Sequence, residues 1–262
     1  MKAVPMTTDS GTGGRFVRAA LTIFPLGLVL LGAGSFVFYF NHREKTEQRA
    51  IKYAAGLRKD LNEADLKRYE QVFNDTLNGP VAERVKTLTS FMESTLGPEN
   101  MGYGVRLLMD KNDPNAAPLA LDVEVTGSRK PRDLIVVVLG FLPSLTTMDN
   151  NNVSRSAAAF LNIAHSLAGQ AKTRSIRFVA LQNMSALKPY YEEDVSPQER
   201  ISHVLLLGAA AEADDATIAA AMHLEGRGVV LLRPSIASGD TQSLLGSASA
   251  ILKQVTELAE RL

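Results

Sequence analysis

The feature that most constrains this chain is a run of 22 uncharged, mostly apolar residues at positions 19–40. A helix of that length, at about 1.5 Å per residue, spans about 30 Å, which is the thickness of a bilayer's hydrocarbon core. A cleaved signal peptide has a shorter apolar core, although residues 33–35 could imitate its cleavage site. A buried soluble helix fits less well, because the run is apolar on every face. We therefore expect residues 15–42 to form a single-pass membrane anchor in the lipid bilayer, after a disordered tail over residues 1–14.

The sequence does not decide on which side of the membrane the rest of the chain lies. Basic residues flank both ends of the apolar run, with Arg15 and Arg18 before it and Arg43 and Lys45 after it. Counting positive charges therefore does not favour an exported C-terminal part. The absence of cysteine fits either side of a bacterial inner membrane. The chain carries 28 basic and 28 acidic residues, so its net charge gives no indication of a nucleic-acid partner.

Residues 43–79 are rich in charge and carry apolar residues at helical spacing. Three interpretations of this segment stay open: a stalk made of a pair of helices, a surface that binds a partner, or a spacer that packs on its own domain. The partner-binding interpretation rests on the apolar positions of the stripe. These are Leu57, Leu61, Leu66, Tyr69 and Phe73. Asn78, Gly79 and Pro80 then interrupt the pattern, and proline suits the first turn of a new helix, so we place the soluble domain at residues 80–262.

The soluble domain alternates between strand and helix patterns. Its clearest element is residues 134–139, an uninterrupted apolar run typical of a central strand that is buried on both faces. Further strands are expected at residues 119–125, 175–181, 204–207 and 229–232, a turn at residues 127–131, and helices from residue 81, at 155–168, at 211–223 and at 241–262. Strands separated by helices predict an α/β fold with three layers (αβα) and a mostly parallel central sheet.

Three segments of the soluble domain follow the order and spacing of one known family. Residues 120–144 read ALDVEVTGSRKPRDLIVVVLGFLPS, residues 154–184 read SRSAAAFLNIAHSLAGQAKTRSIRFVALQNM, and residues 238–262 read SGDTQSLLGSASAILKQVTELAERL. Together they resemble the di-zinc exopeptidases, the aminopeptidases related to glutaminyl cyclase, over roughly residues 81–262. No single segment is diagnostic. The resemblance implies a zinc-exopeptidase-like fold and, because relatives are commonly exported, a periplasmic domain anchored in the inner membrane.

The resemblance also implies a site with two zinc ions, held by histidine and carboxylate side chains, with a glutamate as general base. In this sequence the matching positions carry other residues. They are Leu142 for the first histidine (Phe141 if the register slips by one), Asn151 or Asn152 for the bridging aspartate, Met184 and Ser185 for the glutamate pair, and Gly208 near the next aspartate. The last histidine has no counterpart between residues 228 and 241. Such side chains cannot supply the donors that zinc needs, so we expect a vestigial cleft without a metal or another cofactor.

Other groups do not rebuild a catalytic site. His42, His165, His203 and His223 are not spaced as metal ligands, and there is no G-x-S-x-G motif for a serine hydrolase. The acidic residues 192–194 suit a solvated loop. The polar residues 149–152 could bind a small ligand, but they also suit a turn that caps a helix.

These observations lead to one functional hypothesis and two alternatives. The first is a non-catalytic, membrane-anchored pseudo-peptidase that acts as a structural or assembly subunit and binds other membrane or periplasmic proteins. One alternative is a domain that binds a peptide or another ligand in the vestigial cleft. The other is residual metallopeptidase or other hydrolase activity through an unrecognised site.

Overall fold

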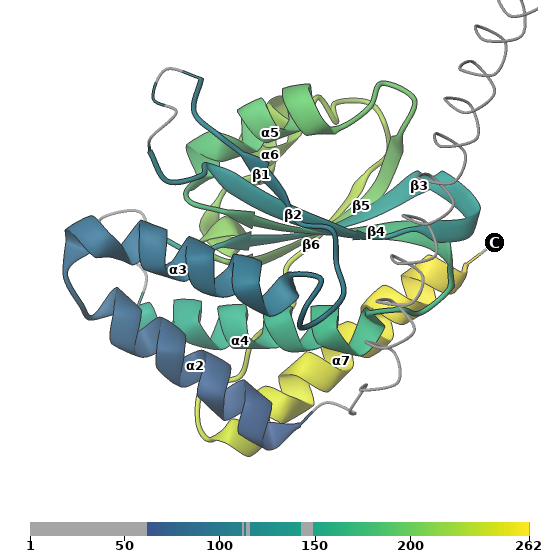
Figure 1. Cartoon of the computed structure of the whole chain (residues 1–262). Helices are drawn as coiled ribbons and strands as arrows, with labels where there is room; N and C mark the ends of the chain where they lie inside the picture. Colours follow the sequence, from purple (N-terminus) through teal and green to yellow (C-terminus); the bar gives the residue numbers. More distant parts are fainter. Residues whose placement is uncertain (1–61, 112, 114–115, 143–148, 262) are drawn as a thin grey trace, which may run out of the picture. The chain divides into compact units, whose positions relative to one another are not determined.

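The apolar run at residues 134–139 is the centre of the sheet in the computed structural model, which describes residues 62–111, 113, 116–142 and 149–261. Within these residues, six strands form one sheet in the order β1-β2-β4-β3-β5-β6 (Figure 1). The strands are β1 (Arg106–Leu108), β2 (Ala120–Val125), β3 (Gly127–Gly140), β4 (Lys172–Leu181), β5 (Arg200–Gly208) and β6 (Val230–Leu232). The described residues all belong to a unit that spans Ala50–Leu262.

Strands β3 to β6 form the parallel part of the sheet. β3 pairs in parallel with β4 and with β5, and β5 pairs in parallel with β6. On the other side of β4, β2 pairs antiparallel with β4, and β1 pairs antiparallel with β2 at the end of the sheet. Between β2 and β3 the chain crosses over the start of β4 at Gly127, where a Cβ atom would lie 2.5 Å from the backbone carbon of Arg174. Only glycine fits this crossing, which brings β2 and β3 to opposite sides of β4.

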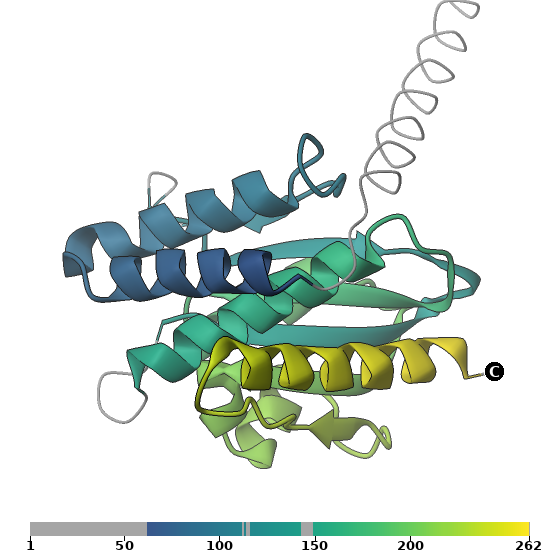
Figure 2. The ribbon, with the colours of Figure 1, turned by 90° about the horizontal axis from the view of Figure 1, so that it is seen from below.

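Helices cover both faces of the sheet. Four of them lie on one face: α2 (Glu63–Leu77), α3 (Val81–Leu96), α4 (Asn150–Leu167) and α7 (Thr241–Glu260) (Figures 1 and 2). The shorter α5 (Leu187–Asp194) and α6 (Asp215–Ala221) lie on the other face.

The side chains of β3 alternate between two separate cores. Ile135 and Val137 belong to the core under the four helices, whereas Val136 and Val138 belong to the core under α5 and α6. The predicted three-layer fold with a mostly parallel sheet is therefore confirmed.

Several predicted elements differ in extent from the observed ones. The expected turn at residues 127–131 is the beginning of β3, because the chain pairs with β4 directly after the crossing. The expected helix at residues 211–223 is instead a 3-10 turn, η2 (Ala209–Glu212), followed by α6, since Asp214 caps a new helix by accepting a hydrogen bond from the Thr217 N–H. The acidic residues 192–194, expected in a loop, form the end of α5.

The segment expected to form a stalk is, from residue 63 on, part of the domain. Leu66, Tyr69 and Phe73 of α2 are at most 2% exposed and belong to the core beside α4. Tyr69 and Phe73 also pack edge-on against Phe91 of α3, with ring centroids 6.2 and 5.9 Å apart. The prediction that these three side chains bind a partner is wrong, because they are the contacts that bury α2 in its own domain. The alternative interpretation, a segment packing on its own domain, describes α2 correctly.

The predicted tail (1–14), anchor (15–42), and the stripe residues Leu57 and Leu61 lie outside the described residues. In the part of the chain that the structure describes, no helix is both long enough and apolar enough to cross a membrane.

Candidate functional site

The predicted cleft positions gather at one edge of the sheet, where the parallel strands end. Gly140 of β3 lies in register with Leu181 of β4 and with Gly208 of β5, so these three strands finish together. Leu142 follows β3, and Met184 follows β4 in the 3-10 turn η1 (Met184–Ala186). In open α/β sheets, ligands bind outside this carboxyl edge, which makes it the first place to look for a site.

The backbone at the end of β5 leaves no room for a side chain at Gly208. This glycine has φ +59° and ψ −140°, a conformation that essentially only glycine adopts. A Cβ atom there would lie 2.5 Å from the carbonyl oxygen of Gly140 and 3.1 Å from the Leu139 side chain. A Cβ atom on Gly140 would in turn lie 2.6 Å from the backbone nitrogen of Ala210. A carboxylate ligand at position 208 would therefore require the ends of β3 and β5 to move apart.

The polar residues before α4 act as a helix cap. The Asp149 carboxylate accepts a hydrogen bond from the Asn151 backbone N–H at 3.1 Å. The Asn150 amide donates to the Asn78 side chain at 3.0 Å and thereby joins the start of α4 to the end of α2. Asn151 and Asn152 are exposed in the first turn. Capping accounts for this run, as one of its two interpretations anticipated.

The remaining cleft positions are held by local contacts. Asn183 caps η1 by accepting hydrogen bonds from the Ser185 backbone N–H, at 3.0 Å, and from the Ser185 hydroxyl. Met184 is partly buried against the core under α5 and α6, and Leu142 against the core on the opposite face. Each of these side chains has a structural role that needs no ligand.

The donor set at this edge does not fit a di-zinc site. Among the described residues, no three histidine, aspartate or glutamate side chains come close enough together to hold a metal ion. The cleft positions themselves offer a thioether, amides, a hydroxyl and a glycine, whereas zinc in proteins is bound by imidazole, thiolate and carboxylate groups.

A buried arginine that the sequence analysis missed holds the segment between β6 and α7. Arg155 lies in the second turn of α4, and its side chain is only 7% exposed. Its guanidinium donates to the Ala237 carbonyl at 2.8 and 3.1 Å, to the Gly239 carbonyl at 3.0 Å and to the Asp240 carbonyl at 3.1 Å. It also forms an ion pair with Glu70 of α2 at 3.0 Å. This arginine fixes the segment in which the family's last histidine has no counterpart, and five directed donors explain how one side chain can do so.

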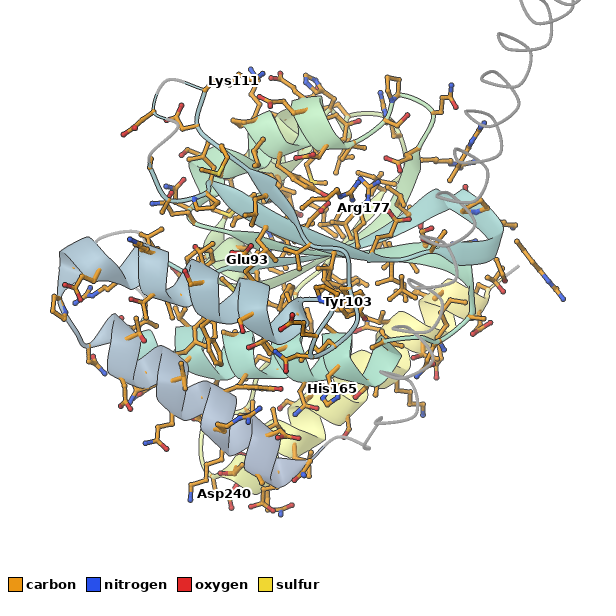
Figure 3. All side chains as sticks on the ribbon, in the orientation of Figure 1. Glu93, Tyr103, Lys111, His165, Arg177 and Asp240 are labelled. Carbon is orange, nitrogen blue, oxygen red and sulfur yellow. The ribbon has the colours of Figure 1, made fainter. Side chains whose placement is uncertain are left out.

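A second buried arginine, Arg177 of β4, lies under α5 (Figure 3). It forms ion pairs with Glu124 at 3.3 Å and with Glu199 at 2.6 Å, and it donates to the Asp194 carbonyl at 3.0 Å. These contacts bind the end of α5 and the loop before β5 to the sheet. Because the charge is buried and every contact is made within the domain, we interpret the group as structural.

Beside this group, Arg106 of β1 forms two hydrogen bonds with Asp122 of β2, at 2.7 and 2.8 Å. The Tyr190 hydroxyl donates to the same carboxylate at 2.9 Å. Burial, followed by the negative charge of Asp122, raises the pKa of Tyr190 well above its ordinary value, so the phenol stays neutral and remains a donor. The contacts explain why the short β1 and α5 form at all.

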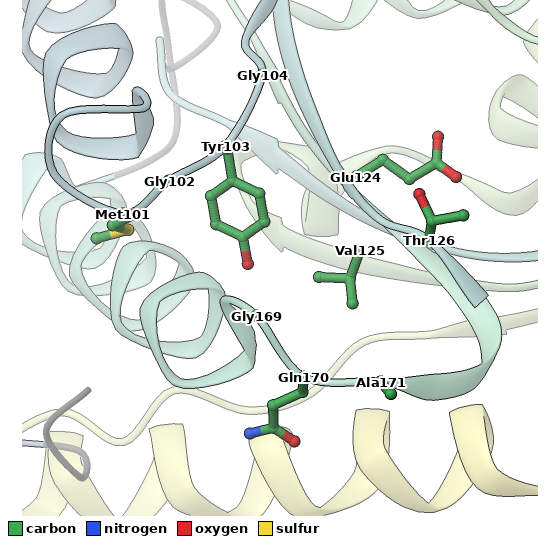
Figure 4. A pocket seen from close by; sticks show the side chains of 10 residues that line it. All are labelled: Met101, Gly102, Tyr103, Gly104, Glu124, Val125, Thr126, Gly169, Gln170 and Ala171. Carbon is green, nitrogen blue, oxygen red and sulfur yellow. The ribbon is translucent and has the colours of Figure 1, made fainter. Parts of the chain in front are cut away.

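Two cavities lie at the opposite edge, where the parallel strands begin. One, of about 360 Å³, lies between residues 101–104, 124–126 and 169–171, with the ring of Tyr103 in its wall (Figure 4). The Tyr103 hydroxyl donates to the Ala164 carbonyl at 2.7 Å. The other cavity, of about 310 Å³, is lined by residues 197–201 with Leu224 and Arg227. Neither contains a residue of the predicted cleft.

Comparison with known proteins bears on the fold. No protein-family model matches the chain, and no curated protein matches it. Among solved structures, a Zn-dependent exopeptidase from Parabacteroides distasonis matches at a TM-score of 0.50 and 9% identity, over 76% of this chain and 99% of that one. Glutaminyl cyclase from Porphyromonas gingivalis matches at a TM-score of 0.50 and 10% identity, over 76% of this chain and 100% of that one. The domain has a zinc-exopeptidase-like fold.

A zinc aminopeptidase from Bacillus subtilis, BSAP, also matches, at a TM-score of 0.38 and 10% identity. That match covers 55% of this chain, which spans only half of BSAP. At such identities the likeness concerns the fold alone. The expected resemblance to zinc exopeptidases and glutaminyl cyclase is confirmed at that level.

Proposed function

We propose that this chain is a non-catalytic, membrane-anchored pseudo-peptidase that acts as a structural or assembly subunit of a membrane protein complex. One observation carries the proposal: the carboxyl edge of an exopeptidase-like fold has residues that cannot bind zinc at the expected ligand positions. Gly208 adds to it, since the backbone there has no space for a ligand side chain. The uncharged run at residues 19–40 supports the anchor.

The buried stripe of α2 narrows down where a partner could bind. Leu66, Tyr69 and Phe73 are used inside the domain, so partner contacts fall to the anchor, to residues 43–61 or to the domain surface. The periplasmic location and the inner membrane follow from the resemblance and form part of the proposal.

The test is extraction of the tagged full chain from its native membrane in mild detergent, followed by mass spectrometry of the proteins that co-purify. We expect a set of membrane or periplasmic proteins in constant ratio to the chain. A matched variant replaces residues 43–61 by a glycine-serine linker of equal length and leaves α2 intact. A chain that always purifies alone contradicts the proposal.

The alternatives have less support. Peptide binding in the vestigial cleft would use the carboxyl edge, where the polar residues 149–151 and Ser185 are occupied in helix caps. Calorimetry of the full chain with peptides of varied sequence would favour this alternative if it gave measurable heat without metal. Residual hydrolysis would be favoured by zinc-dependent release of amino-terminal residues from such peptides.

A further inference from the structure

The edge at which the parallel strands begin carries a concentration of positive charge that the proposed function does not explain. Six cationic side chains lie at the starts of three adjacent strands and at the end of α7. We call this set the basic edge; it consists of Arg129, Lys130, Arg132, Arg174, Arg200 and Arg261. In Figure 1 it lies on the side where the C-terminus is marked. Four of its members are exposed and two are partly buried.

Within the described part of the domain, these charges are not paired with carboxylates. Among the described residues, no carboxylate lies within ion-pair distance of any of the six, although two carboxylates are close in the fold. Asp133 is the register partner of Arg200, and Glu260 is held by Lys172 at 3.4 Å. The buried arginines of the molecule behave differently: Arg155 and Arg177 both have carboxylate partners.

Two features of the basic edge are unfavourable for the folded domain. Lys130 and Arg174 are register partners on the parallel strands β3 and β4, at one paired position between two shifts of register, so two cations lie on neighbouring strands. The Nε atom of Arg174 is buried and has no hydrogen-bond partner in the described structure. Burial, together with the positive charges of Arg174 and Arg261, lowers the pKa of the nearby His203. The helix dipole accounts for a cation at the end of α7, but not for those on the strands.

We propose that the basic edge docks on the anionic surface of the bilayer that holds the chain. This rests on the anchor of the proposed function. Only about 21 residues separate the run at 19–40 from the described domain at Asn62, a distance of at most about 75 Å when extended. The tether keeps the domain at a high effective concentration near the membrane. Directly after the run, residues 43–52 carry four basic and two acidic side chains, and this net positive charge would be attracted to anionic lipids.

The experiment uses the full chain in vesicles of phosphatidylcholine, with or without phosphatidylglycerol. Because the chain has no cysteine, one introduced thiol carries the only dye. The probe position is Ala171, exposed beside the basic edge, and the matched position is Ala216, exposed at the opposite edge in the first turn of α6. A lipid with a quencher on its headgroup reports how close each position lies to the membrane surface.

We expect the quencher to reach residue 171 much more strongly with phosphatidylglycerol than without it, while residue 216 does not change. The variant R129Q/R132Q/R200Q should weaken docking about a hundredfold, at about fivefold for each charge. The control K67Q/K86Q/K188Q removes the same charge from exposed lysines elsewhere and should retain docking. Raising the salt concentration from about 0.15 M to about 1 M should abolish docking of the unmodified chain, because the screening length falls to about 3 Å.

Equal quenching at residue 171 in both kinds of vesicle, or quenching that the triple variant retains, overturns the docking proposal. Flotation of the vesicles after an alkaline wash distinguishes a failure of docking from a failure of the anchor. A chain that floats without responding to phosphatidylglycerol overturns docking alone. A chain that the wash removes overturns the anchor, and the docking proposal with it.

Discussion

The two edges of the sheet use their charged and small residues in opposite ways. At the carboxyl edge, Asp149, Asp214 and Asp240 cap helices, and Arg155 is bound to three carbonyl groups. At the amino edge, the six cations of the basic edge have no carboxylate within ion-pair distance among the described residues. The edge at which this fold usually places a ligand is therefore stabilised as structure. The other edge carries the charge that remains available for binding.

Replacing Arg155 by methionine tests the carboxyl edge with the largest expected effect. It would leave Glu70 and the carbonyls of residues 237–240 without their donor, and we expect the free energy of unfolding to fall by about 3–5 kcal/mol. Urea denaturation measures it. Arg233→Met is the matched control, since Arg233 also binds carbonyls and a carboxylate, Asp215, but is more exposed. That variant should lose no more than about 1 kcal/mol. Equal losses of stability in the two variants would mean that the burial of Arg155 does not increase its contribution to the free energy of unfolding.

Replacing Gly208 by alanine tests the close approach of β3 and β5. We expect a loss of about 3 kcal/mol, from the positive φ and from the contact with the Gly140 carbonyl. Gly226→Ala is the control, because Gly226 has φ +70° and open space around it. It should lose about 1 kcal/mol. Thermal unfolding of both variants gives the difference, and equal losses would show that the strand ends can separate to admit a side chain.

Replacing Asp149 by alanine removes the cap of α4 and should lower the free energy of unfolding by about 1 kcal/mol. Asp149→Asn is the control that keeps a capping oxygen, and it should lose less. If Asp149→Ala were neutral in urea denaturation, the polar run before α4 would need an explanation other than capping.

Replacing Lys130 by glutamine tests the amino edge, and here we expect a change of opposite sign. Removing one member of the Lys130–Arg174 pair relieves repulsion and should raise the free energy of unfolding by about 0.5 kcal/mol at low salt. The gain should disappear at about 1 M salt. A loss of stability would mean that Lys130 has an attractive contact and that the two edges are less different than described.

Replacing His203 should have the smallest effect on stability, and the effect should be visible in the pH dependence of the free energy of unfolding. Burial and the charges of Arg174 and Arg261 lower its pKa in the folded state, so the stability it contributes is present above its unfolded pKa of about 6.5 and is lost as the pH falls through and below that value. His203→Gln should flatten the stability curve in that range. Titration by NMR should also show the His203 pKa rising when anionic vesicles are added. If the pKa of His203 does not change when anionic vesicles are added, that result would argue against docking.

The main elements of the fold could be predicted from the sequence because their patterns are local. The apolar run of β3, the alanine-containing helix α4, which is buried along most of its length, and the long amphipathic helix α7 each carry their own signal. β1 and α5 could not be predicted, because their stability comes from distant partners: Arg106 and Tyr190 meet at Asp122. The stripe of α2 was ambiguous for a related reason, since an apolar face looks the same whether it covers its own core or a partner.

At the candidate site, too, some features could be predicted from the sequence and others could not. The resemblance placed Leu142, Met184 and Gly208 at one edge, where the structure has them. It gave no indication that Gly208 closes the gap between two strands, because such a contact depends on the backbone of β3. Arg155 was missed, although it is the only lysine or arginine in α4, where it lies between Ser154 and Ser156. Its partners are backbone carbonyls, which no pattern of side chains reveals.

The most direct test of the central claim is the zinc content of the purified full chain after dialysis against zinc and removal of the unbound ion. We predict far less than one zinc ion per chain and a thermal midpoint that zinc does not change, because the carboxyl edge lacks the donors. About one or two tightly bound zinc ions per chain, with a raised midpoint, would contradict the account and would restore the exopeptidase-like site as a metal centre.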